Sequence, residues 1–390
     1  MLKLRTFTGA ALLCACAGAA ADPIYTVLNL GSLGGPDSGA KAINAHGQVT
    51  GWTTGLQFES LAFSLDGSYH MVDLGSLGGT RSIGWGINEF GSVTGESSIS
   101  TSNAVLHAFK AVAGSPMVDL GTLGGLTSIG RAINASGRVV GSSETSGDGQ
   151  HAFVTDAAGD LVDLGTLGGD ASAAYGINDA GQIAGWARSA PVGPYAGPNH
   201  AFVTDASGQM TDLGTLIGAD YTSFGYAINA HGQVAGISDT GSGAMHAFIT
   251  NLSGTMVDLG ALDLGGSNYS TGLGLNNLGQ VVGHSFSPLS GIQHAFVTIG
   301  GVMTDLNDLV DPGPGDWVLT EANGINDSGQ ISAVAYNPAG NARAVLLYLT
   351  ASPIPEPATW LLLAVGTGLV LARRNSLSLT RTDTAPRSRR

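Results

Sequence analysis

Cysteine and charge are both scarce in this chain. Its two cysteines, Cys14 and Cys16, lie within the first 20 of 390 residues. The rest of the chain therefore has no disulfide, no thiol nucleophile and no thiolate metal site. Charged residues make up 11% of the sequence, against about a quarter in an average globular protein. A helical period of apolar residues is also missing between the two ends, so the main body must be stabilised by the packing of strands.

The charge that is present is unevenly distributed. Residues 22–352 contain 7 basic and 27 acidic residues, a net charge of −20, whereas six of the 15 basic residues follow residue 372. An acidic body repels phosphates, so no nucleic-acid partner is expected. The same composition suits a soluble protein outside the cell. It predicts no cofactor and leaves calcium as the alternative.

The N-terminal residues 1–21 have the pattern of a signal peptide. Lys3 and Arg5 provide the basic start, residues 8–17 are mostly apolar, and Ala19, Ala20 and Ala21 form a small-residue cleavage site. A lipid-modified Cys16 is the alternative. Either interpretation predicts export through the inner membrane.

The C-terminal region begins with a proline hinge and continues into a short apolar run. Residues 352–374 contain this hinge, the apolar residues 360–372 and two arginines, and residues 375–390 form a basic tail that is predicted to be disordered. The run of 13 residues is shorter than the roughly 20 that span a bilayer. We therefore expect a transient membrane segment that acts as a sorting signal. Prolines and flanking arginines disfavour a buried helix of the domain.

This region resembles the PEP-CTERM sorting signal, with the matching residues Pro355, Glu356, Pro357, Arg373 and Arg374. The resemblance implies an exosortase-type sorting enzyme as partner and a destination at the cell surface or outside the cell. It also implies an association with exopolysaccharide and biofilm production. Such signals usually end soon after the arginines, so the tail of residues 375–390 leaves open whether the segment is cleaved.

Between the two ends, residues 22–351 repeat one pattern of about 45 residues. The most regular marker is an Asn-x-x-Gly turn, whose first residue recurs at spacings of 44, 46, 44, 51, 47 and 50. These asparagines are Asn44, Asn88, Asn134, Asn178, Asn229, Asn276 and Asn326. Fixed motifs with a drifting period indicate one structural unit with variable loops.

Each repeat contains four strand signals. The first ends in Asp-Leu-Gly, the second and third are joined by the Asn-x-x-Gly turn, and the fourth contains the His-Ala-Phe type of triplet. Four antiparallel strands in this period predict a seven-bladed β-propeller of four-stranded blades; a β-solenoid is the alternative. The second strand is rich in small residues and should line the crowded central channel, with the Asp-Leu-Gly strand outermost. Pairing of residues 25–30 with residues 344–349 would complete the last blade and remove an open edge.

The fourth strand carries a His-Ala-Phe triplet in five copies, and these residues resemble the extracellular HAF repeat family. The resemblance covers residues 25–350 and implies no catalytic residue. The first copy departs, with Leu61, Ala62 and Phe63, and so does the last, with Arg343. The five histidines are His107, His151, His200, His246 and His294.

Repeated polar residues are interpreted as structural. The histidines could ligate a metal, but a ring of repeats would hold them apart, so we expect each to bond to a neighbouring strand. The acids of the first strand could bind calcium, but they lack the spacing of a calcium loop and better suit turn caps. They are Asp73, Asp119, Asp163, Asp212, Asp258 and Asp305, with Asn29 in the first copy.

Catalytic residues should occur once rather than in every repeat. The unique insertions, residues 188–199, 263–269 and 308–317, place no nucleophile beside a base. Aromatic residues could stack on sugars or fill the space between blades; they are Trp52, Trp85, Trp186, Tyr195 and Trp317. The sequence therefore predicts a noncatalytic surface or matrix protein with an extracellular polysaccharide as its partner. The alternative is a polysaccharide-processing enzyme.

Overall fold

A computed structural model describes residues 25–57, 59–147, 149–191, 195–265, 268–310 and 317–350. The predicted signal peptide, sorting segment and basic tail lie outside these residues. The described part contains strands and one short 3-10 turn, η1 (Leu306–Asp308). The described residues from 25 to 349 form one compact unit.

Five sheets consist of four antiparallel strands each. The first is β2 (Gly34–Ile43), β3 (Val49–Gly55), β4 (Ser60–Leu65) and β5 (Met71–Asp73). The second is β6 (Ser82–Ile87), β7 (Val93–Ser98), β8 (Leu106–Ala111) and β9 (Val118–Asp119). Two more are β18 (Ser223–Ile228), β19 (Val234–Asp239), β20 (Met245–Thr250), β21 (Met256–Asp258), and β22 (Tyr269–Leu275), β23 (Val281–Ser287), β24 (Ile292–Ile299), β25 (Val302–Asp305). The fifth is β26 (Val318–Ile325), β27 (Ile331–Tyr336), β28 (Ala342–Leu349) and β1 (Tyr25–Asn29).

The remaining eight strands form one larger sheet. They are β10 (Gly124–Ile133), β11 (Val139–Thr145), β12 (Gln150–Thr155), β13 (Leu161–Asp163), β14 (Gly168–Ile177), β15 (Ile183–Ser189), β16 (Asn199–Thr204) and β17 (Met210–Asp212). Hydrogen bonding thus separates five four-stranded blades, not the seven predicted. The reason is local, because a single parallel pair, Gln150 with Ala171, joins β12 to β14.

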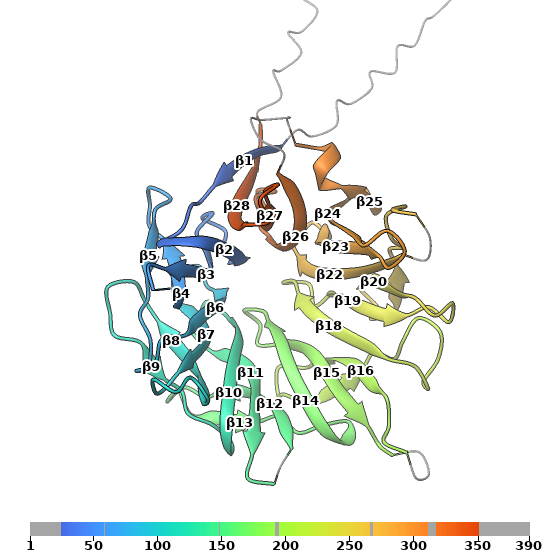
Figure 1. Ribbon diagram of the computed structural model, residues 1–390. Coiled ribbons are helices and arrows are strands. Elements are labelled where there is room, and N and C mark those ends of the chain that lie inside the picture. Colours follow the sequence, from blue (N-terminus) through green and yellow to red (C-terminus); the bar gives the residue numbers. More distant parts are fainter. Residues whose placement is uncertain are drawn as a thin grey trace, which may run out of the picture. The chain divides into compact units, whose positions relative to one another are not determined.

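The sheets are arranged radially as in a propeller, with the first strand of each set nearest the centre (Figure 1). This is the predicted strand order, with the small-residue strand innermost and the Asp-Leu-Gly strand at the outer edge. A β-solenoid would not place these first strands around a common centre. The architecture is therefore all-β and propeller-like, rather than the solenoid alternative.

The two terminal strands pair with each other. β1 runs antiparallel to β28, from Tyr25 opposite Leu349 to Asn29 opposite Val345. The first strand of the array thereby becomes the outermost strand of the last sheet, which the sequence predicts from its two incomplete ends. The pairing covers the edge of β28 that the last three strands would otherwise leave open.

The core lies between adjacent sheets and contains a phenylalanine from the third strand, counted outward from the centre, of each of the first six repeats. These rings are fully buried and are Phe63, Phe109, Phe153, Phe202, Phe248 and Phe296. Burial of such a side chain stabilises a fold by about 1.5–3 kcal/mol. Phe153, for example, packs with Ala108 of the preceding unit. The Ala108 backbone N–H also donates to Ser128 Oγ of β10 at 2.8 Å, so neighbouring units are tied by hydrogen bonds as well as by packing.

Candidate functional site

Every innermost strand carries a β-bulge three residues before its repeated asparagine. In β10, for example, the pairing with β11 shifts between Gly130 and Ala132, which leaves Arg131 as the extra residue. A bulge residue is left out of the ladder, so its side chain is re-aimed. We call these residues the bulge ring: Lys41, Trp85, Arg131, Tyr175, Tyr226, Leu273 and Asn323.

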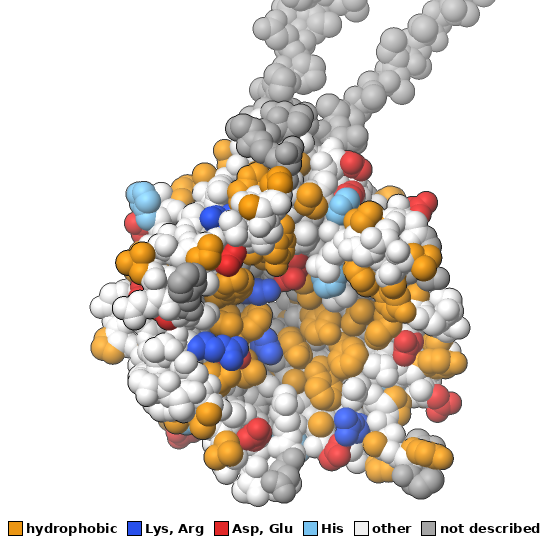
Figure 2. Space-filling model, in the orientation of Figure 1, with side chains coloured by type: hydrophobic (Ala, Val, Ile, Leu, Met, Phe, Trp, Pro, Cys, Tyr) orange, Lys and Arg blue, Asp and Glu red, His pale blue; other side chains and the backbone are white. Residues whose placement is uncertain are grey.

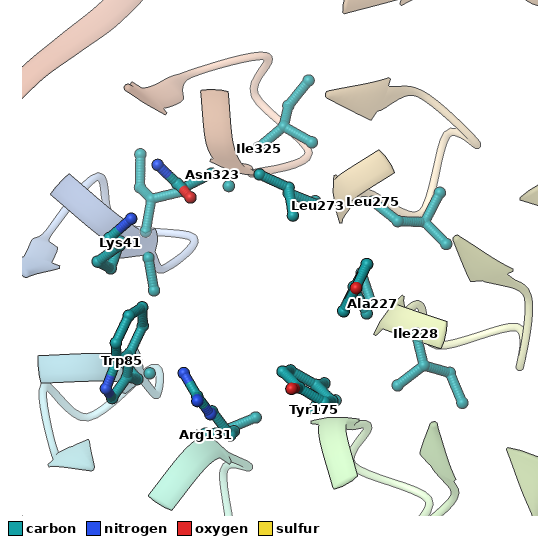
Figure 3. Close-up of a pocket in the computed structure, with 18 of the residues that line it drawn as sticks. Lys41, Trp85, Arg131, Tyr175, Ala227, Ile228, Leu273, Leu275, Asn323 and Ile325 are labelled. Atoms are coloured by element: carbon teal, nitrogen blue, oxygen red, sulfur yellow. The ribbon is translucent and has the colours of Figure 1, made fainter. Parts of the chain in front are cut away.

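All seven members of the bulge ring line one cavity of about 550 Å³ (Figure 3). Unlike the conserved motifs around it, this position holds a different residue in almost every repeat. A ring of equivalent backbone positions thus presents an asymmetric set of side chains, which is the property that a specific binding site requires.

The residue after each bulge is small because the inner strands approach one another closely. A Cβ built on Gly86 would lie 2.9 Å from Ala132 Cα, and one on Gly274 would lie 2.9 Å from Gly324 Cα. Real Cβ atoms essentially never come this close, so glycine is required there. The backbones therefore form the wall of the channel, and the bulge side chains determine its chemistry.

One half of the bulge ring is aromatic and cationic. The guanidinium carbon of Arg131 lies 4.5 Å from the centre of the Trp85 ring and 5.2 Å from that of Tyr175. Tyr175 in turn meets Tyr226 edge to face, with 5.1 Å between ring centres. Burial raises the pKa of Tyr226 to about 12 and Tyr175 adds to the rise, while the charge of Arg131 opposes it. Tyr226 consequently keeps its hydroxyl proton at any ordinary pH.

The other half contains a partly buried ion pair. Lys41 Nζ lies 2.8 Å from Glu321 Oε1. Burial acts to raise the pKa of Glu321, but the charge of Lys41 and hydrogen bonds from Lys41 and Asn323 outweigh it, so the pKa is lowered. Burial lowers the pKa of the neighbouring His284, which is therefore neutral at neutral pH. Glu321 is thus held as an anion and His284 as an uncharged imidazole.

Two buried nitrogens of residues that line this cavity have no hydrogen-bond partner among the described residues. They are Nε1 of Trp85 and Nδ1 of His284. Buried polar groups are normally satisfied, so exceptions point to places where a further group belongs. No carboxylate of the described residues lines the cavity. The pair of facing acids that glycoside hydrolysis uses is therefore not presented to it.

The repeated asparagines form a second ring, which we call the asparagine ring. Each side-chain Nδ2 donates to the backbone carbonyl of the next asparagine, from Asn44 to Asn88 at 2.9 Å and finally from Asn326 back to Asn44 at 3.0 Å. The five intermediate bonds measure 3.0–3.3 Å. The ring of hydrogen bonds is closed and has seven members.

The same asparagines cap their own turns. Asn276 Oδ1 accepts from the backbone N–H groups of Leu278 at 3.1 Å and Gln280 at 3.0 Å. The glycine of each turn has a positive φ, for example 78° at Gly137, which is the left-handed region that glycine favours. Each asparagine therefore holds both a turn and the junction with the next repeat.

The asparagine ring borders a second, smaller cavity of about 290 Å³. Its charged lining residues are Glu89, Asp179 and Asp327, with no lysine or arginine among the described residues that line it. These carboxylates are engaged by neighbouring repeats: Ala135 N donates to Asp179 Oδ1 at 2.8 Å, for example. Seven aliphatic side chains line both cavities and separate the two sets of polar residues: Ile43, Ile87, Ile133, Ile177, Ile228, Leu275 and Ile325.

The five repeated histidines lie apart, each within its own set of four strands. Nδ1 of each contacts the repeated aspartate of the outermost strand, at 2.8–3.0 Å in four cases. The pairs are His107–Asp119, His151–Asp163, His200–Asp212, His246–Asp258 and His294–Asp305. The aspartate also caps its turn, as where Gly121 N donates to Asp119 Oδ1 at 2.8 Å. No group of three or more metal-ligating side chains occurs among the described residues.

The sequence prediction did not single out the bulge ring as a site. Trp85 is among the candidate aromatic residues of the sequence. Lys41, Arg131, Tyr175 and Tyr226 are not among the candidates, because they lie in a strand whose small residues indicate only a crowded channel. The repeats do contain a signal for it: the residue three positions before each asparagine varies from repeat to repeat, whereas the residues on both sides of it are always glycine or alanine. Of the other candidate aromatics, Trp186 packs edge to face on Phe224 at 5.7 Å, and Tyr195 is 76% exposed.

The predicted sorting residues Pro355, Glu356, Pro357, Arg373 and Arg374 lie outside the described residues. Residues 353–375 match the family profile of the PEP-CTERM protein-sorting motif. The motif implies export and sorting at the membrane, with an exosortase as the enzyme that recognises it. Within the described part of the chain, no helix is long and apolar enough to cross a membrane.

Solved structures similar to this chain are distant. A gluconolactonase from Xanthomonas campestris is 13% identical over 84% of this chain and 95% of its own, with a TM-score of 0.38. A triple arginine-to-alanine mutant of AofleA from Arthrobotrys oligospora is 10% identical over 72% of this chain and 88% of its own, also with a TM-score of 0.38. Similarity at this level assigns no activity. No curated protein sequence matches the chain.

Proposed function

We propose that this chain is a noncatalytic protein of the cell surface or extracellular matrix that binds a polysaccharide at the mouth of its central channel. The observation that carries the proposal is the bulge ring. Repeated positions converge on one cavity of about 550 Å³ and fill it with unlike side chains, among them Trp85, Arg131 and Tyr175. Aromatic rings beside a few polar groups are the usual composition of a ligand pocket.

The rest of the chain serves to build and deliver this site. We propose that the eight-stranded sheet counts as two blades, which gives seven in all and agrees with the seven members of the asparagine ring. The repeated asparagines and histidines then have structural roles, and the extracellular HAF repeat family, which the repeats resemble, assigns no catalytic residue. The sorting motif supports delivery to the surface. Association with exopolysaccharide or biofilm, without calcium or another cofactor, completes the proposal.

A direct test measures binding of the purified protein to a panel of soluble polysaccharides by titration calorimetry. We expect at least one polymer to bind, and the variant Tyr175→Leu to weaken that binding about tenfold or more. Tyr195→Ala is the matched control, because Tyr195 is an exposed aromatic that does not line the cavity. If no polymer binds, or if both variants bind as the wild type does, the proposed site is wrong.

The alternative function is a polysaccharide-processing enzyme. The observation in its favour is the cluster of Lys41, Glu321 and neutral His284 beside the cavity, since perturbed ionisable groups gather at catalytic sites. It is disfavoured because no carboxylate of the described residues faces the cavity. Incubating the bound polymer with the protein and measuring chain length separates the two functions. If the wild type shortens the polymer and His284→Gln does not, the protein is an enzyme rather than a noncatalytic binding protein.

The sorting proposal is tested in the cell. Deleting residues 353–374 should change where the protein accumulates, while deleting only residues 375–390 leaves the motif in place and serves as the control. An unchanged distribution after the first deletion contradicts the proposal. A shift after the second deletion alone would show that the tail carries the signal.

A further inference from the structure

The cavity bordered by the bulge ring contains two cations whose surroundings differ. Lys41 is neutralised by Glu321 at 2.8 Å. Arg131 makes no ion pair with any carboxylate of the described residues, and its guanidinium lies over the rings of Trp85 and Tyr175. The cavity therefore keeps one uncompensated positive charge inside a body whose net charge is −20.

The position of Arg131 between two aromatic rings has a chemical consequence. A cation–π contact uses none of the guanidinium N–H groups in a hydrogen bond, so the N–H edge stays available to donate. That edge matches the two oxygens of a carboxylate and binds them with two parallel hydrogen bonds. Side chains that would compete are neutral or engaged: Tyr226 keeps its proton, His284 is uncharged, and Glu321 is bound to Lys41.

From this geometry we infer that the ligand of the channel mouth is an acidic saccharide, and that Arg131 binds the carboxylate of one of its uronic-acid units. The inference rests on the proposed polysaccharide-binding function and specifies its substrate class. The rings of Trp85 and Tyr175 flank the guanidinium and offer apolar faces to the sugar ring beside that carboxylate (Figure 3).

The charged residues that line this mouth are Lys41 and Arg131, so they favour entry of an anion although the body as a whole is acidic. Lysine and arginine side chains lie mainly on one side of the central hollow, with acidic side chains close by, and the wall of the hollow is largely hydrophobic (Figure 2). Low-dielectric walls focus the field of a buried charge and raise its effect on an approaching ligand. The opposite cavity is bordered by Glu89, Asp179 and Asp327 and repels the same ligand. A uronate chain should therefore bind at one mouth only.

The deciding experiment uses one polymer in two charge states. Polygalacturonate and its fully methyl-esterified form share the sugar backbone and differ in the carboxylate. We expect the purified wild-type protein to bind the acid form at least about tenfold more tightly than the ester. The variant Arg131→Met should remove this difference, because it should weaken binding of the acid form by a larger factor than binding of the ester.

Controls separate the carboxylate contact from damage to the fold. Arg343→Met removes an arginine of β28 that does not line the cavity, and it should bind like the wild type. Arg131→Lys keeps the charge but loses the bidentate edge, so we expect an affinity between those of the wild type and Arg131→Met. Unchanged thermal unfolding of each variant shows that the cavity is intact.

The outcomes distinguish this inference from the proposed function. Equal binding of both polymers by the wild type, or an equal loss for both polymers in Arg131→Met, overturns the acidic-saccharide inference and leaves polysaccharide binding standing. Absence of binding to every polymer removes the proposed function itself. Competition by free galacturonate at millimolar concentration would support the carboxylate contact and identify a single sugar unit, rather than the chain, as its source.

Discussion

The asparagine ring and the bulge ring lie three residues apart on the same seven strands, yet they differ in every respect that matters for function. The first consists of one residue type, is buried, and closes on itself through hydrogen bonds of 2.9–3.3 Å. The second contains lysine, tryptophan, arginine, tyrosine, leucine and asparagine, and it faces a cavity. One ring joins the repeats, and the other gives the assembled molecule a specific surface.

This difference separates stability from recognition within one repeat. A residue on which the fold depends must satisfy the same contacts in each copy, so it cannot vary. A bulge residue is released from the ladder and contributes little to it, so its side chain is free to differ. The two rings therefore make opposite predictions for substitution, and these can be tested against each other.

The largest effect is expected in the asparagine ring. Asn276→Ala removes two turn-capping bonds and the bond from Nδ2 to the carbonyl of Asn326, which then keeps only the N–H of Gly329 as its donor. We therefore expect the unfolding free energy to fall by about 3 kcal/mol. Asn251→Ala is the control. Asn251 caps an exposed turn in the same way, through the N–H groups of Ser253 and Thr255, and its side-chain bonds among the described residues all lie within that turn. Urea unfolding should show the clearly larger loss for Asn276→Ala. Equal losses of unfolding free energy in the two variants would show that the asparagine ring does not stabilise the junction between repeats.

A second large effect is expected where the inner strands approach each other. A Cβ on Gly274 would lie 2.9 Å from Gly324 Cα, so Gly274→Ala should cost about 2 kcal/mol through overpacking. Gly67→Ala is the matched control, because nothing lies within 4 Å of the added atom and the residue has no positive φ. Thermal unfolding compares the two. A neutral Gly274→Ala would mean that the strands can separate at no cost.

A smaller effect is expected in the bulge ring. Leu273→Asn copies the residue found at the same position in the last repeat, and it should change the unfolding free energy by less than about 1 kcal/mol. The free energy of polysaccharide binding should change by more than the free energy of unfolding does. A loss as large as that of Asn276→Ala would contradict the separation of the two rings.

The smallest effect is a pH dependence that arises from His284. Burial lowers its pKa in the folded protein, so below the ordinary value of about 6.5 the unfolded chain binds more protons than the folded one. Stability from the neutral His284 is therefore lost as the pH falls below that value. The difference in Tm between the wild type and His284→Gln should decline from pH 7.5 to 5.5. A constant difference would show that His284 does not titrate differently on folding.

Much of the fold could be predicted from the sequence because repetition makes local signals reinforce one another. The Asn-x-x-Gly turns, the four strand signals and the incomplete terminal strands predicted a propeller closed by β1 and β28, and that pairing is found. The separation into seven sheets was not reproduced, because one parallel pair between Gln150 and Ala171 joins two sets of strands. Such a pair depends on how closely strands of two neighbouring repeats approach each other, which no local pattern specifies.

The site was harder to predict than the fold. A single strand shows only that Arg131 follows a glycine, and nothing in its neighbourhood indicates the bulge that re-aims its side chain. Trp85 and Tyr175 are 46 and 44 residues away in the sequence. Only closure of the ring brings them around one guanidinium.

The sequence by itself determined the repeat, the turns, the order of strands within each unit and the address at the C-terminal end, because each of these depends on contacts or recognition within a short segment. The tertiary structure alone decided which positions meet at the channel. Residues separated by a full repeat come together there through the radial arrangement of the sheets, and that arrangement turns a variable position of the repeat into a candidate binding site.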